Sequence, residues 1–124
     1  MPEPDAVTEP DSSEALARCA ARAAADLKAS DVVILDVGPL LSIAGYFVIA
    51  SASNPRQVRA VVDDIEAKVK SELQRSPVRT EGVREQQWTL IDYGDVVVHV
   101  FLDSVREFYE IERLYMDAAR LDWE

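Results

Sequence analysis

The side chains that most often perform catalysis are scarce in this chain, which has one histidine, His99, and one cysteine, Cys19. A general base needs a histidine held in a cleft by an orienting partner, and a zinc site needs several nitrogen or sulfur ligands. One histidine and one cysteine supply neither set. We therefore expect Cys19 to be a small core residue, and His99 to pack inside the fold or to contact a partner.

Carboxylate pairs are the other candidates for chemistry. Asp63 and Asp64 fall on a predicted helix, and Asp92 and Asp95 flank a predicted turn. A two-metal site for phosphoryl transfer requires carboxylates that converge on one point. Asp92 and Asp95 could approach each other across the turn, but aspartate is also common in turns for its local geometry, and we favour that role.

Loops that cradle phosphates need several glycines at fixed spacing, and the four glycines of this chain are scattered at positions 38, 45, 82 and 94. Together with the scarcity of histidine and cysteine, this pattern predicts a protein that is not an enzyme. It also predicts no metal and no cofactor.

Charge and hydropathy narrow the classes of partner. The 23 acidic residues against 13 basic ones give a net charge of −10, which opposes approach to a phosphate backbone and favours encounter with a basic protein. No apolar run approaches the roughly 18 residues of a membrane-spanning helix. The acidic, proline-bearing start resembles neither a secretory signal nor a transit peptide. We expect a soluble cytoplasmic protein that contacts no membrane and little or no nucleic acid.

The first half of the chain predicts two helices and two strands that would position these residues. A disordered acidic tail over 1–11 precedes a single domain over 12–119, and residues 120–124 are expected to fray. Apolar spacing predicts helices over 12–29, with Asp11 and Glu14 as a capping box, and over 55–74, where Pro55 follows Asn54. Apolar β-branched runs predict buried strands over 32–35 and 46–50.

The second half predicts a hairpin and a last helix. Strands over 88–92 and 95–102 are separated by Tyr93 and Gly94, after a short strand near 78–80. A helix is expected over 104–119, with Ser104 and Glu107 as a capping box. The order of elements predicts an α/β fold, a mixed sheet of four or five strands with flanking helices.

Aromatic side chains gather between positions 88 and 115, interleaved with acidic residues and arginines. They are Trp88, Tyr93, Phe101, Phe108, Tyr109 and Tyr115. Aromatic residues with a few well-placed charges are typical of binding hot spots. Helical spacing over 105–115 is equally typical of a core-facing stripe, and from the spacing alone both interpretations stand.

The run WTLIDYGDVVVHVF over 88–101, followed by VREFY over 105–109 and ERL over 112–114, resembles the signature of the ribosomal silencing factor, or Iojap, family. Further similarity lies in YFVIAS over 46–51 and RQV over 56–58, and the resemblance covers roughly residues 12–119. It implies a fold related to minimal nucleotidyltransferases without their catalytic carboxylates. The implied activity is binding of the large ribosomal subunit through ribosomal protein L14, which blocks joining of the small subunit and lowers translation when nutrients are scarce.

The resemblance also implies a set of partner-facing residues and a homodimer when the protein is free. The residues that match the family's pattern are Trp88, Asp92, Tyr93, Asp95, His99, Arg106, Tyr109, Glu112 and Leu114. Gly45, Ala52 and Tyr115 depart from it, since the family usually has Asp, Gly and Trp at these places. Two alternatives stay open: a large-subunit assembly factor that uses the same surface, and a nucleotidyltransferase-type enzyme that uses Asp92 and Asp95.

Overall fold

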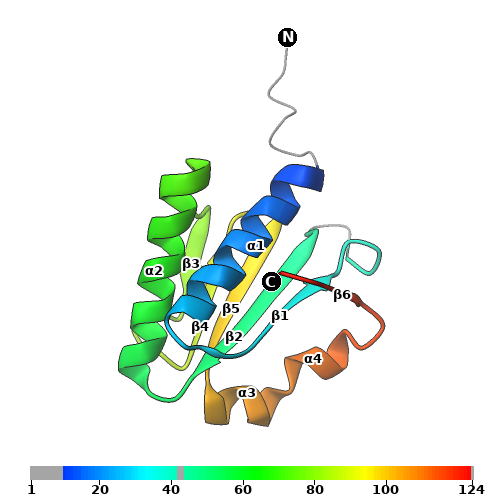
Figure 1. Ribbon diagram of the computed structural model, residues 1–124. Coiled ribbons are helices and arrows are strands. Elements are labelled where there is room, and N and C mark those ends of the chain that lie inside the picture. The colour runs from blue at the N-terminus through cyan, green and yellow to red at the C-terminus, as the bar shows by residue number, and fades with distance from the viewer. Residues whose placement is uncertain (1–9, 42–43, 124) are drawn as a thin grey trace.

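The computed structural model describes residues 10–41 and 44–123 as helices packed on one mixed sheet (Figure 1). The elements are α1 (Pro10–Asp26), β1 (Ser30–Asp36), β2 (Tyr46–Ala52), α2 (Pro55–Leu73), β3 (Arg79–Glu81), β4 (Trp88–Asp92), β5 (Val96–Leu102), α3 (Asp103–Tyr109), α4 (Ile111–Leu114) and β6 (Ala119–Leu121). The predicted α/β class is confirmed. The sheet has six strands instead of four or five, because the short strand expected near 78–80 forms one edge as β3 and the unpredicted β6 forms the other.

The strand order is β3-β4-β5-β2-β1-β6, and only the central pair, β2 and β5, runs parallel. The connection between these two strands contains α2 and the β3–β4 segment. It brings the first half of the chain next to the hairpin that carries most of the candidate residues. The segments that sequence similarity highlights, 46–51 and 88–101, therefore lie in adjacent strands.

Helices α1 and α2 lie side by side on one face of the sheet (Figure 1). Alanines on α1, including Ala17, Ala20 and Ala24, are fully buried, and their small side chains allow close packing. The Asn54 side chain accepts a hydrogen bond from the Gln57 amide at 2.8 Å, which confirms the predicted start of α2. No helix in the described part of the chain is long and apolar enough to cross a membrane.

The start of α1 differs from the prediction by two residues. The helix begins at Pro10 instead of residue 12. Residues 1–9, where most of the disordered tail is predicted, lie outside the described residues. The side chain of Asp11, the predicted cap, is outside the described part as well.

The predicted helix over 104–119 is broken into α3 and α4, because Glu110 takes a left-handed backbone conformation with φ of 47°. The expected capping box of Ser104 and Glu107 does not form. The N-cap position is Leu102, whose amide still donates to the Gln87 carbonyl, so the helix starts directly from the end of β5. The break buries Ile111 against the sheet face opposite α1 and α2.

Residues 119–123 are packed on the fold, although fraying was expected over 120–124; Glu124 lies outside the described residues. Residues 119–121 form β6, which pairs antiparallel with β1 and places Leu121 opposite Ile34. The Trp123 indole Nε1 donates to the Val32 carbonyl at 3.0 Å. Periodicity could not reveal this segment, because a three-residue edge strand exists only through the strand that it pairs with.

Replacing Trp123 tests whether this contact stabilises the fold. We expect Trp123→Phe, which keeps an aromatic ring but loses the N–H donor, to lower the free energy of unfolding by about 1 kcal/mol. Trp123→Ala should cost more, because the indole also packs against the core under α1. Urea unfolding followed by circular dichroism measures both. Equal stability of all three proteins would mean that the C-terminus adds nothing to the fold.

Candidate functional site

The β4–β5 hairpin positions the two aspartates that could have formed a catalytic pair. Gly94 has φ of +93°, and its amide donates to Asp92 Oδ1 at 2.8 Å, so Asp92 shapes the turn. The other carboxylate oxygen of Asp92 lies 3.3 Å from Arg79 Nε. Asp92 therefore has the turn-forming role that the sequence favoured.

Asp95 is held by a different set of partners. Arg75 binds both of its carboxylate oxygens, at 2.7 and 3.2 Å, and Ser13 Oγ donates to one of them at 2.6 Å. Burial alone would raise the pKa of Asp95, but the Arg75 and Ser13 hydrogen bonds hold that pKa below its usual value. Asp95 thus ties the hairpin to α1 and to the end of α2. Within residues 10–41 and 44–123, no group of three or more His, Cys, Asp or Glu side chains could hold a metal ion.

Tyr93 lies in the core between the sheet and the α1–α2 layer, and it is almost fully buried. Burial raises the pKa of its hydroxyl far above the usual value. The hydroxyl has no hydrogen-bond partner among the described residues. The Tyr93 side chain is therefore not exposed in this structure, whereas the family resemblance implied that it faces a partner.

The opposite face of the sheet carries an aromatic cluster, which we define as Phe47, Trp88, His99, Phe101 and Tyr109. The Trp88 ring stacks on Phe101 with centroids 4.7 Å apart and lies 5.0 Å from the Tyr109 ring. The imidazole of His99 packs edge-on against Phe47 at 4.8 Å, and Trp88 Nε1 donates to His99 Nδ1 at 3.1 Å. Alternation along β5 places His99 on the same face as Val97 and Phe101, as predicted.

Burial lowers the pKa of His99 from 6.5 to about 4, so the imidazole is neutral near pH 7. The unfolded chain binds this proton near pH 6.5 while the folded protein does not. The contribution of His99 to the free energy of unfolding is therefore fully present above pH 6.5, and it is lost as the pH falls toward 4. The expected loss from His99 is on the order of 3 kcal/mol, at about 1.4 kcal/mol per pKa unit.

Because His99 is the only histidine, a His99→Gln variant isolates this effect. Urea unfolding between pH 7 and pH 4 should show a steeper loss of stability in the parent than in the variant. Asp95 and Glu112 have lowered pKa values in the folded protein, so their protonation at lower pH reduces the free energy of unfolding in both the parent and the variant. If the free energy of unfolding falls with pH equally steeply in the parent and in His99→Gln, His99 is not buried in its neutral form.

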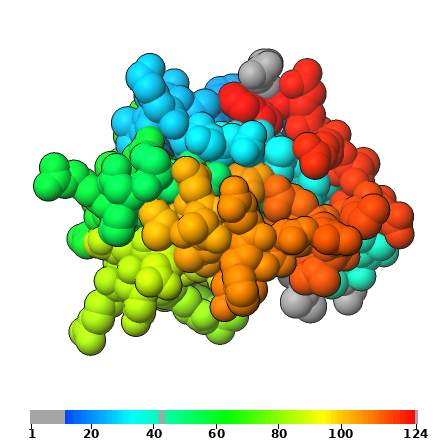
Figure 2. Space-filling model, turned by 90° about the horizontal axis from the view of Figure 1, so that it is seen from below, coloured from blue at the N-terminus to red at the C-terminus, as the bar shows by residue number. Residues whose placement is uncertain are grey.

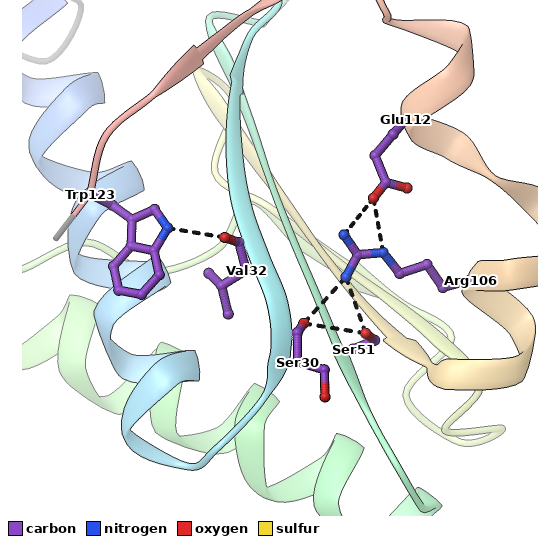
Figure 3. A network of polar contacts seen from close by, with 6 residues as sticks. All are labelled: Ser30, Val32, Ser51, Arg106, Glu112 and Trp123. Carbon is purple, nitrogen blue, oxygen red and sulfur yellow. Dashed lines mark hydrogen bonds and ion pairs between the residues drawn. The ribbon is translucent and has the colours of Figure 1, made fainter.

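Arg106 and Glu112 form a bridge inside the protein (Figure 3). The buried guanidinium donates to Glu112 Oε2 from Nε at 3.1 Å and also from Nη2. Its Nη1 donates to Ser51 Oγ at 3.1 Å and to the Ser30 carbonyl at 3.3 Å. Burial opposes ionisation of Glu112, yet the Arg106 hydrogen bonds keep the pKa of Glu112 below its usual value. The bridge fixes α3 and α4 to the adjacent ends of β1 and β2.

Beyond this bridge the chain exposes apolar side chains, which we call the α3–α4 surface. Its members are Phe108, Tyr109, Leu114 and Met116, with exposed fractions of 79, 53, 75 and 76%. Figure 2 shows that residues of this segment, in orange, occupy the middle of the face seen from below. Exposed Glu107, Glu110 and Asp117 lie on the same segment. Several exposed large apolar side chains on one short segment, with acidic neighbours, are typical of a protein-binding site.

The structure sorts the nine candidate residues by accessibility. Tyr93, His99 and Arg106 are buried, Trp88, Asp92, Asp95 and Glu112 are half-buried, and Tyr109 and Leu114 are exposed. Sequence reasoning named Phe108 among the aromatic residues but not among the nine partner-facing candidates, and it missed Met116. The available signal was an apolar pair at Phe108 and Tyr109, which a helix as short as α3 cannot turn to the core together.

The three departures from the family pattern have simple structural settings. Tyr115 packs edge-on against Phe47 at 5.1 Å, so it still supplies an aromatic ring to this face. Ala52 is buried at the end of β2. The Gly45 amide donates to the Asp95 carbonyl at 2.8 Å, and a Cβ at Gly45 would come within 3.3 Å of that oxygen.

Comparison with known proteins decides the family. A sequence model described as "Ribosomal silencing factor during starvation" matches residues 10–124. The chain belongs to the ribosomal silencing factor family. Ribosomal silencing factor RsfS of Halalkalibacterium halodurans is 37% identical over 113 residues, which cover 91% of this chain and 96% of that protein.

Two further family relatives bear on fold and function. The crystal structure of protein CV0518 from Chromobacterium violaceum matches with a TM-score of 0.78 and 37% identity, over 82% of this chain and 83% of that one. A mouse protein named "Mitochondrial assembly of ribosomal large subunit protein 1" is 34% identical over 89 residues, 70% of this chain and 39% of that protein. The family that the hairpin signature indicated is thus confirmed, and it includes a relative named for ribosome assembly.

Proposed function

We propose that this protein silences ribosomes: it binds the large ribosomal subunit through ribosomal protein L14 and sterically blocks joining of the small subunit. Translation would then fall under nutrient limitation. Family membership supports this function, and the observation that carries it is the exposed apolar α3–α4 surface beside the aromatic cluster. We also propose that the protein acts in the cytoplasm and forms a homodimer when free.

Electrostatics supports a basic protein partner. The net charge of −10 favours association with a positively charged surface, and Glu107 and Asp117 are exposed on the segment that carries the apolar side chains, where Glu110 is paired with Arg113 at 3.0 Å. Acidic groups at the rim mainly speed association, while the apolar side chains at the centre supply most of the affinity. Raising the salt concentration should therefore slow binding, because exposed charges are screened.

This activity requires no catalytic step, and we propose that the protein is not an enzyme. The carboxylates of Asp92 and Asp95 are engaged by Gly94, Arg79, Arg75 and Ser13, so neither is free to hold a substrate-bound metal. The enzyme alternative makes a clear prediction. Magnesium-dependent turnover of a nucleoside triphosphate that Asp95→Asn abolishes would contradict our proposal.

Truncation of the α3–α4 surface should weaken binding to the large subunit. We expect Tyr109→Ala and Leu114→Ala each to cost about 2 kcal/mol of binding free energy, as hot-spot residues do. Leu114 is largely exposed, so Leu114→Ala should change the free energy of unfolding little; Tyr109 also packs on Trp88, so the stability of Tyr109→Ala is measured beside its binding. Co-sedimentation with separated ribosomal subunits measures the binding, and a subunit-joining assay measures the block.

Lys70→Ala is a matched control, because it truncates an exposed side chain on α2, in the helical layer on the opposite face of the sheet. It should bind like the parent. If Tyr109→Ala and Leu114→Ala also bind like the parent, the contact lies elsewhere. If the parent does not sediment with the large subunit at all, the proposed function is wrong.

Large-subunit assembly is the second candidate function, favoured by the mouse relative named for that process. The same surface would serve both functions, so binding experiments do not separate them. Cells that lack the protein do separate them. Accumulation of immature large subunits during rapid growth would favour assembly, whereas normal subunits with excessive joining during starvation would favour silencing.

A further inference from the structure

A groove lies on the open sheet face next to the aromatic cluster. It has a volume of about 370 Å³, and its walls are mainly apolar, with Leu41, Ala44, Phe47, Leu90 and Val97 among them. His99 also lines it, between Leu90 on β4 and Ile49 on β2 in the strand register. Arg79 and Asp92, which form an ion pair, also line the groove. Its size suits one large side chain of a partner.

The hydrogen bond from Trp88 fixes the tautomer of His99. An indole nitrogen can only donate, so Nδ1 of His99, 3.1 Å away, must present its lone pair. A neutral imidazole carries one proton, which is therefore on Nε2. His99 thus holds an N–H donor on the ring atom that points away from Trp88.

Within the described part of the chain, this donor meets no acceptor. His99 is 4% exposed, and Nε2 has no hydrogen-bond partner among the described residues. The ring of Phe47, 4.8 Å from the imidazole, offers at best a weak π contact. A buried polar group without a partner costs free energy, and a bound molecule that supplies an acceptor recovers it.

We infer that this groove receives one large apolar side chain of the basic protein partner, and that His99 Nε2–H donates to a main-chain carbonyl oxygen of the same segment. The inference rests on the proposed function and names the chemistry of one part of that contact. The occupant is a segment of a basic protein because the chain carries a net charge of −10; the charge of Asp92 at the groove is compensated by Arg79. Since Nε2 is shielded in the free protein, a side chain of the groove must rotate when the segment binds.

The single histidine allows a direct test, because ¹⁵N labelling of histidine gives the signals of one ring. In the free protein we expect Nε2 to be protonated and Nδ1 not. On addition of purified ribosomal protein L14, the Nε2 proton resonance should move downfield and its exchange with water should slow. A proton on Nδ1 in the free protein, or a complex in which the His99 signals do not change, would overturn the inference.

Two substitutions separate the two nitrogens. His99→Asn keeps an oxygen near the Nδ1 position for Trp88 but removes the donor at Nε2, whereas His99→Gln places an amide donor near Nε2. We expect His99→Asn to weaken L14 binding about tenfold and His99→Gln to weaken it less. Equal binding by both variants and the parent would contradict a role for the donor.

The groove itself is tested by a charge on its wall, with circular dichroism to show that the variant is folded, because Leu41 also packs against the core cluster of this face. Leu41→Glu places a charge on the groove wall and should weaken L14 binding by at least about tenfold, while Ala67→Glu makes the same charge change on the exposed side of α2. Retained sedimentation of Leu41→Glu with the large subunit at parental affinity would overturn the groove assignment alone. Absence of subunit binding by the parent would overturn the proposed function and the inference with it. His99 signals that shift with concentration of the free protein would assign the groove to a second copy instead.

Discussion

Arg106→Ala is expected to lower the free energy of unfolding by about 3–5 kcal/mol, the usual cost of removing one partner from a buried ion pair. The substitution would leave the half-buried carboxylate of Glu112 without its counter-ion. It would also remove the donor that Ser51 Oγ and the Ser30 carbonyl share (Figure 3). Urea unfolding measures the loss. Hydrogen exchange should show that α4 loses protection first, because Arg106 holds it to the sheet.

Two milder variants test the geometry of this bridge. Arg106→Lys keeps the charge but cannot donate to Glu112, Ser51 and Ser30 at once, so it should recover only part of the loss. Glu112→Gln keeps the shape and removes the carboxylate charge, and should cost less than Arg106→Ala. Both should weaken large-subunit binding, because Leu114 follows Glu112 on α4. Wild-type stability in Arg106→Ala would show that the bridge is dispensable.

Tyr93→Ala is also expected to lower the free energy of unfolding by about 3–5 kcal/mol, because truncation of a buried aromatic side chain leaves a cavity. Tyr93 packs between the sheet and the α1–α2 layer, so the cavity would lie in the larger of the two cores. Subunit binding by the fraction that remains folded should be nearly unchanged. Calorimetric unfolding together with co-sedimentation at low temperature separates stability from affinity.

Tyr93→Phe is the matched control. Its ring fills the same space and lacks the hydroxyl, which has no hydrogen-bond partner in the described structure. We therefore expect Tyr93→Phe to be at least as stable as the parent, since it removes an unsatisfied polar group. A stable Tyr93→Ala that fails to bind would instead place Tyr93 at the contact surface.

Local sequence patterns predicted the elements that contain their own signals. Asn54 and Pro55 predicted the start of α2, and Tyr93 with Gly94 predicted the hairpin turn, because caps and turns depend on a few neighbouring residues. The run over 88–101 indicated the family, which comparison confirmed. Ser104 with Glu107 was a wrong prediction, because the end of β5 set the start of α3 one residue earlier.

The composition and the hairpin motif by themselves determined that this is an acidic α/β protein with little catalytic inventory and a ribosomal silencing factor signature. Only the tertiary structure decided which candidates are exposed in the free protein. The family signature over 88–114 contains Tyr93, His99, Tyr109 and Leu114 alike, yet packing buries the first two and exposes the others. The reason is that accessibility depends on contacts between strands and helices distant in the chain. The Arg106 bridge to Ser30, the pairing of β6 with β1 and the unpaired Nε2 of His99 arise in the same way, from residues that no local pattern relates.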